Sequence, residues 1–164
     1  MPSGTVINSV EDTVAVILKI IETAKHDIVF LLPPSLFSIA GTYNTVQRAK
    51  PFIDKGGVLR GITVISRENI EEVRMRLDIG VDMRHSDHVH EVFMVVGDKQ
   101  SSVSVLNIGA EAYTLETPVV AYWSEDPTYA EYLLASFETA WSQAVPAEER
   151  IQVLLEQRYQ RADQ

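Results

Sequence analysis

The first half of the chain alternates between two hydrophobic periodicities. From about residue 10 to 25, apolar residues return every three or four positions behind Ser9, which forms a capping-box-like S-x-x-D pair with Asp12. That spacing predicts an amphipathic helix. The uninterrupted apolar run that follows, Asp27 to Pro33, predicts a buried strand. We expect a loop after it, because Pro33 and Pro34 supply no backbone N–H to a sheet.

The same alternation then repeats twice. A helical pattern over residues 42–55 ends at a Gly-Gly pair, and a strand pattern follows over 58–65. Ser66 is the expected N-cap of a further helix, which closes at Gly80 before a strand at 82–86. Strand, helix, strand, helix and strand at these short spacings predict a right-handed βαβαβ unit with parallel strands.

The second half has a different pattern. Three short strands are expected at 91–97, 101–108 and 118–123, with a tight turn at 97–100 between the first two. Asp126 and Pro127 then begin one helix, and Pro146 begins the last. The predicted fold class is therefore α/β, with a mixed β-sheet whose parallel core is extended by a hairpin or meander and flanked by helices. We expect a single domain over residues 1–158 and a polar C-terminal tail at 159–164.

Composition narrows the classes of function. The chain has 14 Lys and Arg against 23 Asp and Glu, a net charge of −9, which opposes phosphate binding and predicts no direct contact with nucleic acid. It has no cysteine, hence no disulfide, thiolate zinc site or cysteine nucleophile. Without a signal-peptide pattern or a long apolar segment, we expect a soluble, cytoplasmic protein that does not contact membranes. The sequence assigns no cofactor.

Three of the four histidines gather directly before an apolar run. His85, His88 and His90 precede residues 92–96, and three interpretations stay open. They could hydrogen-bond locally at a strand end. They could line a ligand pocket at the carboxyl ends of the parallel strands. They could also bind a metal, with His88 and His90 on one strand face and Asp87 or His85 as a third ligand.

The segment that follows carries a family resemblance. His90-Glu-Val-Phe-Met-Val-Val-Gly-Asp-Lys99 resembles the signature strand of the phospholipase D superfamily, H-x-K followed four residues later by D. The resemblance implies that fold, and its single-motif members act as homodimers. The chain also resembles sensor modules of archaeal signalling proteins and TrmB-type regulators.

Position by position, the resemblance places His90 at the nucleophilic histidine of the family. Val92 stands at the lysine position and Gly97 at the aspartate position, with Asp98 one residue late. In the family's chemistry the histidine attacks phosphorus and the lysine neutralises phosphoryl oxygens. Valine has no charge to offer a phosphate, so the resemblance implies a member without catalytic activity.

The sequence thus predicts a non-catalytic sensory or regulatory domain that works as a homodimer and binds a small ligand or a signalling partner protein. The expected ligand-binding residues are Ser35, Ser66, Arg67, Arg84, His85, His88 and His90. One alternative is a degenerate phosphodiesterase or nuclease that uses His90 with help from Arg84 or Lys99. Another is a metal or haem sensor built on the histidines.

Overall fold

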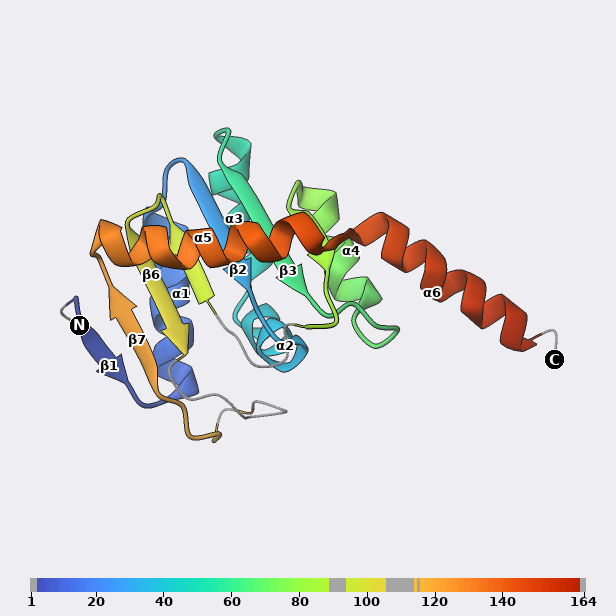
Figure 1. The fold of residues 1–164 in the computed structure, drawn as a ribbon, viewed down its shortest axis with the longest axis horizontal. Coiled ribbons are helices and arrows are strands. Elements are labelled where there is room, and N and C mark those ends of the chain that lie inside the picture. Colours follow the sequence, from blue (N-terminus) through green and yellow to red (C-terminus); the bar gives the residue numbers. More distant parts are fainter. Residues whose placement is uncertain (1–2, 89–93, 106–113, 115, 163–164) are drawn as a thin grey trace.

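An eight-stranded mixed sheet forms the centre of the computed structural model, which describes residues 3–88, 94–105, 114 and 116–162. The strand order is β1-β7-β6-β5-β2-β3-β4-β8 (Figure 1). The strands are β1 (Thr5–Ile7), β2 (Asp27–Leu31), β3 (Val58–Thr63), β4 (Asp82–His85), β5 (Met94–Gly97), β6 (Ser101–Val105), β7 (Ala121–Ser124) and β8 (Val145–Pro146).

Helices cover both faces of this sheet. They are α1 (Val10–Thr23), α2 (Pro34–Thr42), α3 (Thr45–Asp54), α4 (Ile70–Ile79), α5 (Pro127–Gln143) and α6 (Ala147–Ala162). The larger apolar core joins α1 to α4 to one face, while α5 lies across the other face in Figure 1 and forms a second core there. The two cores follow from alternation along the strands. Phe30 of β2 faces the first core, and its neighbours Val29 and Leu31 face the second.

The predicted parallel unit is confirmed. Strands β2, β3 and β4 pair in parallel in that order, with α2, α3 and α4 in their connections. Strands β5, β6 and β7 extend the sheet by antiparallel pairing, so the sheet is mixed as expected. The predicted turn at 97–100 is also present, and its central residues Asp98 and Lys99 have φ of 54° and 56°, as in the turns that join twisted hairpin strands.

Two local predictions were wrong. The two prolines do not lead into a loop: Pro34 begins α2, because the first helical position needs no N–H donor. Ser66 is not an N-cap either, because α4 begins at Ile70 and is preceded by Asn69. The Asn69 side chain accepts the N–H of Ser66 at 3.0 Å and donates to the Val64 carbonyl at 2.9 Å, which fixes the turn after β3.

The C-terminal helix leaves the body of the domain. Its first turns pack against the main core through Ala147, Ile151 and Leu154, and the rest extends away in Figure 1. The helix continues to Ala162 and so includes most of the predicted polar tail. Among the helices in the described part of the chain, none has the length and apolar character needed to cross a membrane.

Candidate functional site

The carboxyl ends of the parallel strands lie together at one end of the sheet, which we call the carboxyl side. There the last residues of β3 and β4, Thr63 and His85, pair directly in register. Strand β5 begins on the same side, because Met94 pairs with Leu31 at the end of β2. Ligands of open α/β sheets bind outside the carboxyl ends of the strands. The chain therefore enters β5 where a ligand site is expected, although His90 and Val92 themselves lie outside the described residues.

His85 is the most constrained of the predicted site residues. It is 5 % exposed, and its Nδ1 accepts the backbone N–H of Ile65 at 2.9 Å. An accepting Nδ1 assigns the ring proton of the neutral imidazole to Nε2. Nε2 lies 3.0 Å from Oδ1 of the exposed Asp87, at ion-pair distance but without a well-aligned hydrogen bond. The side chain is thus held as a neutral imidazole at the end of β4.

The electrostatic surroundings favour the same neutral state. Burial lowers the pKa of His85, and the positive charge of Arg150 lowers it further. Asp87 opposes both effects by its charge and its proximity, but the pKa still falls below the ordinary value. Protonation would also turn Nδ1 into a donor facing the N–H of Ile65.

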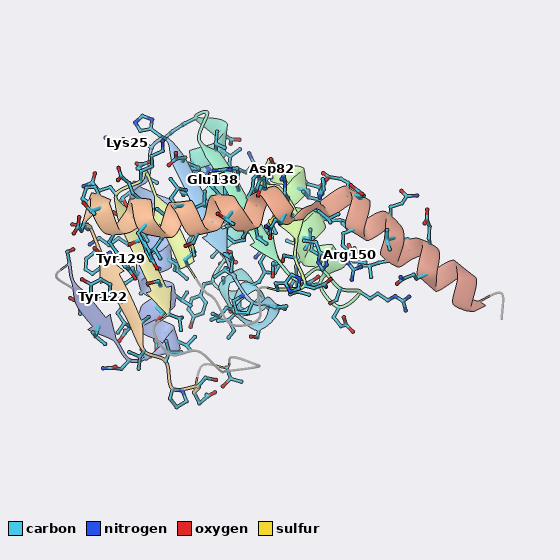
Figure 2. The ribbon with its side chains drawn as sticks, in the orientation of Figure 1. Lys25, Asp82, Tyr122, Tyr129, Glu138 and Arg150 are labelled. Carbon is cyan, nitrogen blue, oxygen red and sulfur yellow. The ribbon has the colours of Figure 1, made fainter. Side chains whose placement is uncertain are left out.

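Two buried polar atoms on this side lack a partner in the described residues. They are Oγ1 of Thr63, which is fully buried, and Nε2 of His85, which has only the poorly aligned carboxylate of Asp87 nearby. Thr63 and His85 are register partners, so both side chains point to the same face of the sheet. Arg150 reaches this region from α6, where Figure 2 labels it, and its Nε donates to the Ile65 carbonyl at 3.1 Å. We call Thr63, His85, Asp87 and Arg150 the His85 cluster.

The other predicted residues surround this cluster unevenly. Ser66 and Arg67 follow Ile65 directly, and His88 is exposed with its N–H bonded to Oγ of Ser86 at 3.2 Å. Arg67 is also exposed and lines a groove of about 250 Å³ between α4 and α6, beside Leu154. Ser35 lies in the first turn of α2, after the end of β2. The structure thus places five of the seven predicted residues, Ser35, Ser66, Arg67, His85 and His88, around the carboxyl side, and His90 is outside the described residues.

Arg84 lies on the opposite face of the sheet from His85. Its Nη1 donates to the Trp141 carbonyl at 2.7 Å, and its guanidinium stacks over the Trp141 ring at 4.1 Å. Successive strand residues point to opposite faces, so Arg84 and His85 cannot share a pocket side by side. Arg84 therefore packs against α5.

The aspartate end of the family motif lies on the other side of the sheet, which we call the amino side. Gly97 pairs with Ile28 at the start of β2, three residues along β5 from Met94, or about 10 Å. Asp98 accepts three backbone N–H groups there, from Lys25 at 2.8 Å, His26 at 2.8 Å and Asp27 at 3.0 Å. Lys25 is labelled in Figure 2, well away from Arg150. Asp98 thus fixes the start of β2.

Asp98 stays ionised because of these bonds. Partial burial raises its pKa, but the three backbone N–H groups lower it by more, with a further contribution from His26. Lys99, considered above as a replacement for the family lysine, follows Asp98 in the same turn and is likewise on the amino side.

A metal site receives no support from the described residues. Among them, no group of three histidine, aspartate or glutamate side chains converges as metal ligands would. Nδ1 of His85 is already used by the Ile65 N–H, which removes one of the donors that the metal hypothesis requires. His90, the other half of the H-x-H pair, is outside the described residues.

Sequence reasoning missed two members of the cluster. Arg150 belongs to the Glu148-Glu149-Arg150 run at the start of α6. From sequence alone this run indicates only the charged first turn of a helix, because the position of α6 beside Ile65 is not visible there. Thr63 sits in a strand and carried no signal of its own. A threonine as the last residue of a parallel strand was the available clue, because that position faces the expected ligand side.

Comparisons with known proteins identify relatives of the fold. No protein-family model matches the chain, and no curated protein matches it. TrmBL2, an archaeal chromatin protein whose structure shows a novel mode of DNA binding, is similar with a TM-score of 0.68 and 14 % identity over 88 % of this chain. This chain spans about half of it, 54 % of its length.

Two similar structures are matched along nearly their whole length. One is Nuc, a phospholipase D family member from Salmonella typhimurium, with a TM-score of 0.66 and 16 % identity over 89 % of this chain and 98 % of that chain. The other is NucT from Helicobacter pylori, with a TM-score of 0.66 and 7 % identity over 87 % and 98 %.

These likenesses correct one prediction from composition. The acidic net charge was taken to exclude direct contact with nucleic acid, and this exclusion was wrong. The same fold occurs in a chromatin protein that binds DNA. Net charge averages over the whole surface, whereas binding depends on where the charges lie. The charge of −9 therefore does not separate this chain from nucleic-acid-binding members of the fold.

Proposed function

Because the chain has a phospholipase D-like fold, we propose that it is a regulatory or sensory domain that binds a small ligand on the carboxyl side without hydrolysing it. The His85 cluster forms the floor of the proposed site. The half-buried Ser66 and the exposed Arg67 and His88 form its rim, and His90 belongs by sequence to the segment before β5. The positive charge of Arg150 acts on this floor, and Arg67 adds a second one at the rim, so both favour a ligand with negative charge.

The position of the available cations carries the non-catalytic part of the proposal. Phosphoryl transfer needs a positive group aimed at the phosphoryl oxygens, and the family position for it is Val92. Of the two substitutes considered, Lys99 lies on the amino side and Arg84 is stacked on Trp141 on the other sheet face. Neither supports a nucleophile at residue 90.

The loss of aspartate at position 97 carries less weight than the sequence indicated. This position lies on the amino side, at the far end of β5 from Met94, and Asp98 beside it has the structural role of fixing β2. The argument against catalysis therefore rests on Val92 and on the positions of Lys99 and Arg84, while Arg150 is engaged with the Ile65 carbonyl.

Hydrolysis of a simple phosphodiester, such as bis(p-nitrophenyl) phosphate, tests the proposal. We expect wild type and His90→Ala to release nitrophenolate at the same background rate. Removing a preorganised catalytic charge typically costs on the order of 10²- to 10³-fold in rate, so a competent site would be readily distinguished from background. Turnover in wild type that disappears in His90→Ala would establish the phosphodiesterase alternative instead.

Homodimer formation stays a prediction of the family resemblance. Sedimentation of the purified chain at micromolar concentration measures it directly, and a monomer alone would remove it.

A further inference from the structure

A small cavity lies under the face of the sheet that α1 to α4 cover, which is also the face that His85 points to. It has a volume of about 50 Å³ and lies between the strands and the layer of α1 to α4. Its walls are almost entirely apolar and include Phe37, Ala49, Ile79 and Val95. None of the seven residues expected to bind the strand-end ligand lines it. The cavity is therefore separate from the site of the proposed function.

One charged side chain, Arg76 of α4, reaches into this apolar wall. The residue is 7 % exposed, and its guanidinium stacks over Phe37 at 3.8 Å from the ring centre. Nη1 donates to the Glu72 carbonyl at 2.9 Å, the one hydrogen bond that the guanidinium makes within the described residues. An arginine has five N–H donors, so four find no acceptor among the described residues and stay available to water or to a ligand.

No carboxylate of the described residues lies within 4.0 Å of Arg76. Glu72 is near enough for its charge to act on the guanidinium, but its carboxylate accepts the Ser38 hydroxyl at 3.0 Å instead. Burial lowers the pKa of Arg76 to about 10 while Glu72 raises it, so the side chain is still a cation at neutral pH. Gly41 leaves space beside it, since a methyl group there would meet Nη2 at 3.4 Å.

Three arginines that are more exposed show the opposite arrangement. Arg74, two residues earlier on α4, is exposed and pairs with Glu71 at 3.3 Å. Arg48 and Arg60 are also paired, with Glu22 and Glu138. Buried charges are normally the paired ones, because desolvation is costly without a counter-ion. Among the described residues, three more exposed arginines thus have a carboxylate partner while the buried Arg76 has none.

We propose that this cavity binds a small aliphatic carboxylic acid, with its carboxylate on Arg76 and its alkyl part between Phe37, Ala49 and Val95. A guanidinium fork matches a carboxylate with two parallel hydrogen bonds. A cavity of about 50 Å³ holds roughly three or four water-sized groups. With the carboxylate on Arg76, three or four groups correspond to the alkyl part, so the ligand is an acid of about four or five carbons in all. The inference does not rest on the proposed function, because the two sites share no residue.

Calorimetric titration of the full chain tests this site. The probes are butyrate and isovalerate, with butyramide as the neutral analogue and dodecanoate as a chain too long for the cavity. We expect the two short acids to bind, and butyramide and dodecanoate to bind at least roughly 10-fold more weakly. Arg76→Met should weaken the short acids by roughly 10- to 100-fold, because it removes charge-assisted hydrogen bonds. Arg74→Met, on the exposed side of the same helix, is the matched control and should leave binding unchanged.

A second variant protects the test against misfolding of Arg76→Met. Ala49→Leu keeps the guanidinium and fills the cavity, so it should also abolish binding while circular dichroism reports a folded chain. The proposal is overturned if the short acids do not bind to wild type. It is also overturned if they bind equally to Arg76→Met and wild type, or if affinity rises steadily up to dodecanoate in both.

Discussion

The two sides of the sheet differ in how they bond their buried titratable side chains. On the amino side, the Asp98 carboxylate accepts three backbone N–H groups, and those bonds fix the start of β2. On the carboxyl side, Oγ1 of Thr63 is buried without a partner among the described residues, and His85 is held neutral beside it. Oγ of Ser102, near the amino side, is the other buried hydroxyl without a partner there, but it has no titratable neighbour of this kind in its register pairs. Native proteins satisfy most buried polar atoms, so unsatisfied ones call for an explanation. The contrast separates a structural motif from a place where a ligand can complete the bonding.

Removing the Asp98 carboxylate on the amino side should have the largest effect on the free energy of unfolding. Asp98→Ala removes an ionised acceptor from three backbone N–H groups, and we expect a loss of about 2 to 4 kcal/mol in the free energy of unfolding. Urea denaturation measures it. The matched change on the carboxyl side is Asp87→Ala, which removes an exposed carboxylate and should cost less than about 0.5 kcal/mol. Similar losses in the two variants would refute the contrast.

The pH dependence of stability tests the His85 cluster. His85 has a lowered pKa in the folded state, so the unfolded chain binds more protons as the pH falls below about 6.5, and stability falls with it. His85→Asn keeps an acceptor for the Ile65 N–H but cannot titrate. We therefore expect wild type to lose stability relative to His85→Asn as the pH is lowered through about 6. Parallel curves for the two proteins in urea denaturation would show that His85 is not held neutral.

A smaller effect is expected from the unpartnered hydroxyl. Thr63→Val replaces it with a methyl group of similar size, so the free energy of unfolding should stay the same or rise by up to about 1 kcal/mol. Thr13→Val is the matched control, since the buried Thr13 hydroxyl donates to the Ser9 carbonyl at 2.7 Å, and it should cost about 1 kcal/mol. A clear loss in Thr63→Val would mean that its hydroxyl has a protein partner.

The smallest effect concerns the turn beside Asp98. Lys99 adopts φ of 56°, a conformation that strains side-chain-bearing residues. Lys99→Gly relieves that strain but makes the unfolded chain more flexible. We therefore expect the free energy of unfolding, measured by urea denaturation, to rise by at most about 1 kcal/mol. A loss of stability would show that the lysine side chain contributes contacts to the turn.

The sequence predicted the parallel unit and the helices because periodicity and caps are local signals. Ser9 and Asp126 cap α1 and α5 as expected, and Gly80 closes α4 with φ of 105°. Helix α2 was missed because the Pro-Pro pair is compatible with both a loop and a helix start. Strands β1 and β8 were missed because they have three and two residues, too few for a periodicity to appear.

The candidate site was predicted less completely, for a physical reason. The side of the sheet followed from the strand order, so His85, Ser66 and Arg67 could be placed there. The partners of each group depend on contacts between distant segments. Arg150 meets Ile65 across 85 positions and Arg84 meets Trp141 across 57, and nothing in the local sequence indicates either pair. The roles of Asp98 and Arg76 depended on such contacts as well.

Amide chemical shifts during titration with inorganic phosphate test the contrast between the two sides most directly. Phosphate serves as the anionic probe, and one spectrum reports on both sides of the sheet at once. The account predicts that the shifting amides cluster at Ser66, Arg67 and His85 to His88, while Lys25 to Asp27 and the turn at Gly97 to Gln100 do not move. Shifts centred on the Asp98 turn, or none at the carboxyl side, would contradict it.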